Sequence, residues 1–93
     1  MKSRLKRHIG PVWLRTCRGR YEATMPDGCR IKVRPWGPWW LAGRQLPRRP
    51  DGTPGVMGWR TVKARRPGYS LRRSAMLVAL EMWRQKSARK ASR

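Results

Sequence analysis

The sequence predicts a small α+β domain, in which an antiparallel meander of three to four β-strands packs against one C-terminal amphipathic helix. Alternating apolar and polar residues flank a turn within 20–34, and apolar residues recur at helical spacing from Leu71 onward. With 93 residues, the chain has room for one domain with a small core. We assign 1–10 to a basic N-terminal arm, 11–90 to the domain and 91–93 to a basic tail, and we expect both termini to be flexible.

A hairpin from Arg20 to Arg34 is the clearest local signal. Apolar residues alternate with polar ones on both sides of Pro26-Asp27-Gly28. A three-residue loop with Gly28 in the left-handed region places every apolar group on one face, whereas a two-residue turn would set charges opposite apolar groups. The expected pairs are therefore Met25 with Cys29, Ala23 with Ile31, and Tyr21 with Val33.

Further strands are expected on both sides of this hairpin. Residues 12–17 have the composition of a first strand, which turns at Arg18-Gly19. Two prolines after Arg34 break a central strand, so we expect a bend followed by a short strand at Trp39–Leu41. The proline- and glycine-rich segment 43–58 is expected to be a long, mobile loop with a turn of its own at Pro50-Asp51-Gly52. Alternation from Trp59 to Arg65 adds a possible further strand.

The C-terminal helix is expected from Leu71 to about Arg89, with Ser70 as its N-cap after a Pro-Gly pair. Its apolar stripe must pack on the apolar face of the sheet, because nothing else in the chain is large enough to cover it. The stripe consists of Leu71, Ala75, Met76, Val78, Leu80, Met82 and Trp83.

The charge of the chain indicates a polyanionic partner. Lysine and arginine number 24 against four acidic residues, which gives a formal net charge of +20. A compact state with this charge repels itself, and a bound nucleic acid would relieve that repulsion. No run of about 20 apolar residues could span a membrane, and no signal-peptide core follows the basic N-terminus. We therefore expect a cytoplasmic protein, associated with the nucleoid or, if phage-encoded, with the host cytoplasm, and no membrane partner.

Enzymatic functions find little support in the sequence. Two cysteines twelve residues apart and a single histidine, His8, are too few ligands for a zinc site, so we expect reduced thiols, no metal and no cofactor. Of the four acidic residues, Asp27 and Asp51 belong to turns and Glu81 to the helix surface, which leaves no acid–base pair. A cysteine nucleophile paired with His8 is the remaining enzymatic alternative.

The polar face of the hairpin is the main candidate binding surface. Arg20 and Arg34 fall opposite each other there, and like charges facing across strands destabilise a sheet unless an anion lies on them. Glu22 is expected opposite Lys32, and the alternative is an ordinary solvated face. The first turn of the helix is a second candidate, because two arginines stand where the helix dipole favours acids; either they bind phosphate or they extend into water. The candidate nucleic-acid-binding residues are Arg18, Arg20, Arg30, Lys32, Arg34, Arg48, Arg49, Arg72, Arg73 and Trp36.

Three tryptophans, Trp36, Trp39 and Trp40, follow the basic strand closely. Aromatic rings among cations are typical of a base-stacking surface. The alternative is that they cap the open end of the core, and we expect two of the three to do so. Trp13 and Trp83 lie in phases that indicate core positions.

The segment RGRYEATMPDGCRIKVR, residues 18–34, resembles the AP2-like and integrase arm-binding domains of phages and mobile elements. The similar features are a Gly-x-Tyr-x-Ala step into a glycine turn and, less closely, an alanine-rich helix that ends in tryptophan. The chain departs from that pattern by a Trp/Pro segment and a long loop before the helix. The resemblance implies a sheet lying in the major groove, with Arg18, Arg20, Arg30, Lys32 and Arg34 facing DNA.

These observations together predict a small, non-enzymatic nucleic-acid-binding protein of phage or mobile-element type that favours duplex DNA. Two alternatives stay open: an RNA- or ribosome-associated basic protein, and a phage inhibitor that docks on a host nucleic-acid-processing enzyme. A membrane-active, tryptophan-rich peptide is disfavoured by the hairpin and helix signals.

Overall fold

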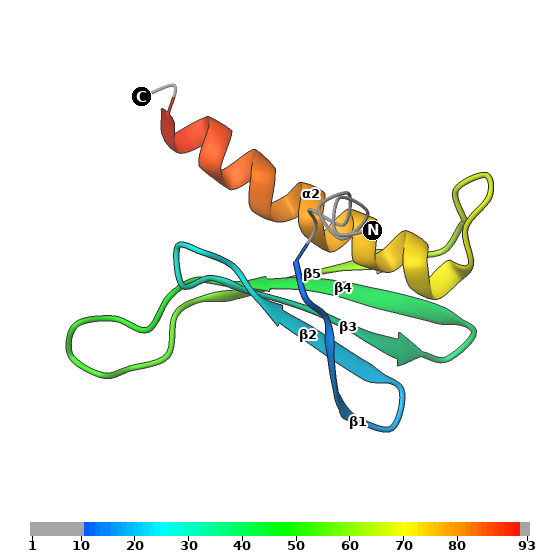
Figure 1. Cartoon of the computed structure of the whole chain (residues 1–93), viewed down its shortest axis with the longest axis horizontal. Coiled ribbons are helices and arrows are strands. Elements are labelled where there is room, and N and C mark those ends of the chain that lie inside the picture. Colours follow the sequence, from blue (N-terminus) through cyan, green and yellow to red (C-terminus); the bar gives the residue numbers. More distant parts are fainter. Residues whose placement is uncertain (1–10, 92–93) are drawn as a thin grey trace, which may run out of the picture.

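The structure, a computed structural model, describes residues 11–91, so the expected arm at 1–10 and residues 92–93 of the tail lie outside the described residues. Five antiparallel strands form an open meander in the order β1-β2-β3-β4-β5, and helix α2 lies across one face (Figure 1). The expected α+β class is confirmed, with one strand more than expected. The elements are β1 (Leu14–Cys17), β2 (Arg20–Thr24), β3 (Arg30–Trp36), β4 (Trp39–Gln45), β5 (Met57–Val62) and α2 (Leu71–Ala91).

The β2–β3 hairpin has the expected register. Tyr21 pairs with Val33, and Ala23 pairs with Ile31, so the apolar groups share one face. The Met25 N–H donates to the Cys29 carbonyl at 2.8 Å, which closes the three-residue loop, and Gly28 adopts a φ of 92° that favours glycine. Asp27 fixes the turn further by accepting a hydrogen bond from the Cys29 N–H at 2.9 Å.

The same turn occurs a second time, between β4 and β5. The Arg49 N–H donates to the Thr53 carbonyl at 2.9 Å, and Asp51 accepts from the Thr53 N–H at 3.0 Å, as Asp27 does in the first loop. Together with the Leu46 to Val56 hydrogen bond of 2.9 Å, this turn makes 46–56 a hairpin arm, which projects beyond the sheet at the left of Figure 1.

The expected strand at Trp39–Leu41 is present, but its expected end at Leu41 and the loop boundaries at 43–58 were wrong, because β4 continues to Gln45 and β5 begins at Met57. Gly43 belongs to β4, where a Cβ would come within 2.5 Å of Met57 Cε and 2.6 Å of Trp59 Cε3. The glycine thus marks a close approach inside a sheet, not a break in it. Pro35 likewise lies within β3, beyond the last residue paired with β2, where the strand has β4 as its neighbour.

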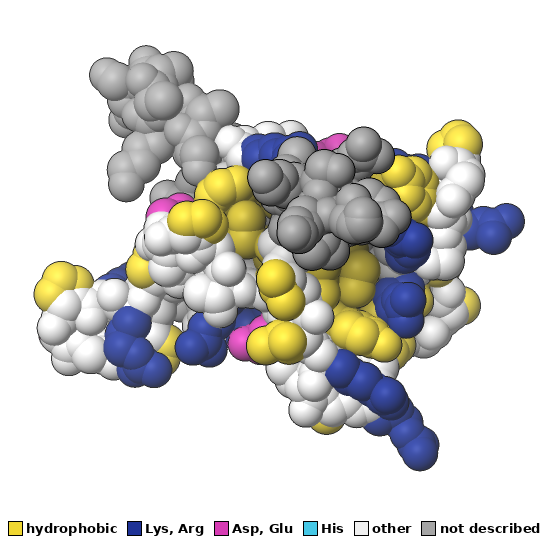
Figure 2. Space-filling model, in the orientation of Figure 1, with side chains coloured by type: hydrophobic (Ala, Val, Ile, Leu, Met, Phe, Trp, Pro, Cys, Tyr) yellow, Lys and Arg dark blue, Asp and Glu magenta, His cyan; other side chains and the backbone are white. Residues whose placement is uncertain are grey.

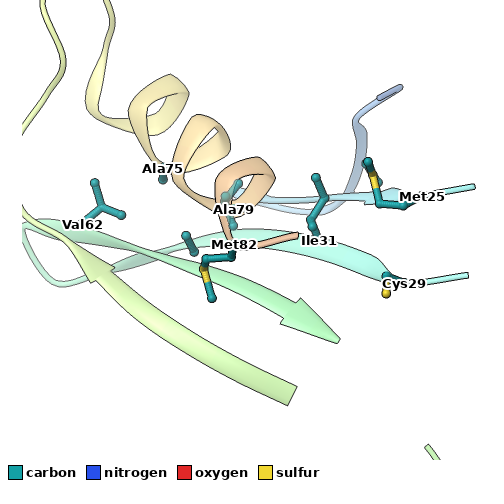
Figure 3. Packing of buried hydrophobic residues seen from close by; sticks show 10 residues of the cluster. Met25, Cys29, Ile31, Val62, Ala75, Ala79 and Met82 are labelled. Atoms are coloured by element: carbon teal, nitrogen blue, oxygen red, sulfur yellow. The ribbon is translucent and has the colours of Figure 1, made fainter. Parts of the chain in front are cut away.

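Helix α2 covers β3 and β4 and closes the core. Ala75, Ala79 and Met82 are buried against the sheet, and Figure 3 shows them beside Ile31 and Val62. The predicted N-cap is confirmed, because the Ser70 hydroxyl accepts a hydrogen bond from the Arg73 N–H at 3.1 Å. The predicted stripe packs as expected, with Ser74 and Ala79 as further buried members that its outline missed.

Two acidic side chains, Asp27 and Glu81, take part in the polar contacts that attach the helix to the rest of the domain. The Trp83 indole N–H donates to Asp27 Oδ2 at 3.0 Å, and the Arg66 guanidinium donates to both Glu81 oxygens at 2.7 and 2.8 Å. The hydrogen bonds from Arg66 hold the pKa of Glu81 below its ordinary value. Partial burial raises the pKa of Asp27, but hydrogen bonds from the Cys29 N–H and the Trp83 indole outweigh it and lower this pKa. Within 11–91, no helix has both the length and the apolar character needed to cross a membrane.

Candidate nucleic-acid interface

The face of the sheet that points away from α2 is here called the open face. Strand register places four cross-strand rows on it, since alternate residues of a strand share a face, and one of these rows joins Arg30, Gln45 and Met57. The first row joins Lys32, Gly43 and Trp59, the second joins Arg34, Leu41 and Thr61, and the third joins Trp36 with Trp39. Leu14, Glu22, Thr24 and Arg30 extend the open face toward β1 and the β2–β3 turn.

Cations gather where β2 and β3 meet on the open face. Arg20, Lys32 and Arg34 line a shallow depression of about 170 Å³ together with Trp59 and one acid, Glu22. Glu22, which lies opposite Lys32 as expected, is the acid of this region and forms an ion pair with Arg30 at 3.8 Å. Both partners of that pair are partly exposed, so it contributes little to stability. Among the described residues, no hydrogen bond or ion pair engages the side chains of Arg20 and Lys32. This site is therefore suited to hold an anion.

Three tryptophans on the open face leave much of their surface exposed. The exposed fractions are 50% for Trp36, 38% for Trp39 and 43% for Trp59. The Arg34 guanidinium lies between two of these rings, 5.6 Å from the Trp36 centroid and 5.7 Å from the Trp59 centroid. The Lys63 ammonium lies 4.5 Å from the Trp39 centroid. Aromatic rings and cations thus alternate across β3, β4 and β5.

The expectation that two of Trp36, Trp39 and Trp40 cap the core was wrong. Only Trp40 packs against the core, because its partners Pro35 and Val62 place it on the helix side of the sheet. Trp13 and Trp83 pack against the core as expected, although both are only partly buried.

The other candidate residues lie in three different places. Arg18 is in the turn between β1 and β2. Arg48 and Arg49 lie in the projecting arm, where Arg48 Nη1 donates to the Gly52 carbonyl at 2.6 Å, and Figure 2 shows dark-blue side chains over this arm at the left.

The helical arginines lie on the helix side of the sheet, apart from the open face. Arg72 donates to the Tyr21 hydroxyl at 3.1 Å and stacks on that ring, while the Arg73 guanidinium lies 5.6 Å from the Tyr69 centroid. Both arginines therefore have aromatic partners within the fold, and they do not join the cations of the open face. Arg20, Arg30, Lys32, Arg34 and Trp36 are the candidates that the fold brings together.

Sequence reasoning missed Trp59 and Lys63 as members of this surface. The alternation of Trp59, Thr61 and Lys63 was the available signal, but the sheet partner of Trp59 is Gly43, which has no side chain to show the pattern.

Comparison of the chain with known protein families, curated proteins and solved structures found no match in any of the three. Within residues 11–91, no cluster of three or more His, Cys, Asp and Glu side chains is placed to hold a metal ion.

Proposed function

We propose that this protein binds nucleic acid, with a preference for duplex DNA, through the cations of the open face. The observation that carries the proposal is the clustering of Arg20, Lys32 and Arg34 around one depression, where these three cations outnumber the one acid of its lining, Glu22. Guanidinium and ammonium groups are the usual partners of phosphate oxygens. Because the chain has a net charge of +20, bound phosphates would also reduce the repulsion between its own positive charges.

The size of the cationic region is compatible with duplex DNA. Strands lie about 4.8 Å apart, so β1 to β3 span roughly 10 Å, and the major groove of B-DNA is about 12 Å wide. The major groove of duplex RNA is too narrow for side chains to read. Arg18, in the β1–β2 turn, and the arm arginines Arg48 and Arg49 supply further phosphate contacts in this proposal.

The proposal is tested by measuring affinity for duplex DNA, single-stranded DNA and structured RNA of matched length across a salt series. Each phosphate contact contributes about −0.9 to the slope of log affinity against log salt on duplex DNA. We expect a steep slope and tighter binding to duplex DNA than to RNA. Stronger binding to structured RNA would favour an RNA-associated protein. Weak binding to all three would contradict the proposal and direct attention to a host enzyme as the partner.

A further inference from the structure

The tryptophans on the open face, Trp36, Trp39 and Trp59, form a surface that we call the tryptophan platform. All three rings belong to strands that the sheet holds in a fixed register, and each is more than a third exposed. Three large apolar rings on one exposed face are not explained by the core, which α2 covers on the opposite side of the sheet.

The platform is built into the sheet by specific contacts. Trp59 lies over Gly43, where the absence of a side chain lets its ring approach the backbone of β4. Trp36 and Trp39 are cross-strand partners at the end of the β3–β4 hairpin. Arg34 lies between Trp36 and Trp59, so a cation is available beside rings that are already positioned.

Two rings of the platform, Trp39 and Trp59, belong to strands beyond the part of the sheet that fits a groove, and Trp36 lies at the end of β3 opposite Trp39. Five strands span about 19 Å, which exceeds the roughly 12 Å width of the major groove, so β4 and β5 extend outside a groove that holds β1 to β3. The faces of paired bases are covered by their neighbours in the duplex. Unpaired bases expose theirs, and they stack readily on tryptophan whatever their sequence.

We propose that the tryptophan platform stacks unpaired bases, so that the ligand is DNA with a single-stranded segment beside a duplex. Lys63 lies next to the Trp39 ring and would hold a phosphate of the unpaired strand. The inference rests on the proposed function, which assigns the cations beside the platform to the duplex. A protein docking on the rings is the competing use, but the cations beside the rings favour an anionic ligand.

The direct test uses the unaltered protein and three DNA probes at about 0.15 M salt. The probes are a blunt duplex, the same duplex with an oligothymidine overhang, and that duplex with an overhang of equal length from which every base has been removed. The two overhangs carry the same phosphates and differ only in their bases. Each stacked base should tighten binding about five- to 150-fold relative to the abasic overhang, with quenching of tryptophan fluorescence.

Variants then assign the effect to the platform. Trp39→Leu should remove much of the difference between the thymidine and abasic overhangs, while binding of the blunt duplex stays within about twofold, because Trp39 does not line the cationic depression. Tyr69→Leu is the matched control, because Tyr69 is 40% exposed and also has an arginine over its ring, but it lies at the start of α2. Circular dichroism establishes that each variant is folded.

The possible failures are distinguishable. Equal affinity for the thymidine and abasic overhangs, with salt-sensitive binding of the blunt duplex, would overturn the platform and leave the proposed function in place. Loss of the difference in Tyr69→Leu but not in Trp39→Leu would move base stacking to the helix side and overturn the assignment. No binding to any probe would overturn both proposals.

Discussion

The two faces of the sheet use their cations in different ways. On the helix side, Arg44 donates to the Met82 carbonyl at 3.0 Å, and Arg72 donates to the Tyr21 hydroxyl. On the open face, Arg20 and Lys32 line a depression without such partners among the described residues, and the Arg34 guanidinium lies over two aromatic rings. In a chain with a net charge of +20, the first set contributes to the fold and the second remains accessible to a ligand.

The contrast is tested most strongly by removing the open-face cations. We expect the triple variant Arg20→Ala, Lys32→Ala and Arg34→Ala to weaken duplex binding about 100-fold at 0.15 M salt and to reduce the salt slope by about 3. Affinity measured across a salt series gives both values. The matched control is Arg65→Ala, Arg72→Ala and Arg73→Ala, which removes the same charge near the start of α2. Equal losses in the two variants would indicate a diffuse charge effect and contradict the contrast.

Gly43→Ala tests whether the open face depends on a close approach between strands. The added Cβ would meet Met57 and Trp59 side chains at 2.5–2.7 Å, so the Trp59 ring must move. We expect a loss of about 1–3 kcal/mol in the free energy of unfolding, measured by denaturant titration, together with a change in tryptophan fluorescence. Gly58→Ala is the control, because a Cβ there meets nothing within 4 Å. Similar losses in both variants would show that strand propensity, not Trp59 packing, sets the effect.

Asp27→Asn is expected to weaken the contact between the β2–β3 turn and α2. The variant exchanges a carboxylate that accepts from the Trp83 indole for a neutral amide, at a cost of about 1 kcal/mol in stability. Because the folded-state pKa of Asp27 is lowered, its contribution is present above the unfolded pKa of about 3.9 and is lost as the pH falls through the folded value. Unfolding measured from pH 6 down to pH 2 should therefore be less pH-dependent in the variant. An unchanged pH profile would contradict the role given to this carboxylate.

Glu81→Gln should have the smallest effect of the series. Arg66 and Glu81 form a bidentate pair, but both side chains are about 40% exposed, so we expect a loss of at most about 1 kcal/mol. The lowered pKa of Glu81 again places its contribution above the unfolded pKa of about 4.3. Thermal melts at pH 7 and pH 3 measure the difference between the two proteins. A decrease in duplex affinity of tenfold or more would contradict the assignment of this pair to the fold.

The sequence predicted those parts of the fold in which the order of apolar and polar side chains has the period of a strand or of a helix. Alternation around Pro26-Asp27-Gly28 determined the β2–β3 register, and helical spacing after Ser70 determined α2. The extension of β4 was missed because Gly43 carries no side chain that could show an alternating pattern. The prolines after Arg34 were expected to end the strand, but β3 continues through Pro35, where it no longer pairs with β2. The cationic part of the site followed from the hairpin register. Trp59 comes to lie beside the cations of the open face only because β5 pairs with β4, and no local pattern in the sequence specifies that pairing.

The central claim is that the open face, not the helix side, contacts nucleic acid, and the six tryptophans supply a direct test. Each indole N–H gives its own signal in a ¹⁵N–¹H correlation spectrum, which can be followed as duplex DNA with an overhang is added. We expect the signals of Trp36, Trp39 and Trp59 to shift while those of Trp40 and Trp83 stay in place. Shifts of Trp83 and Trp40 with unchanged signals from the open face would contradict the account.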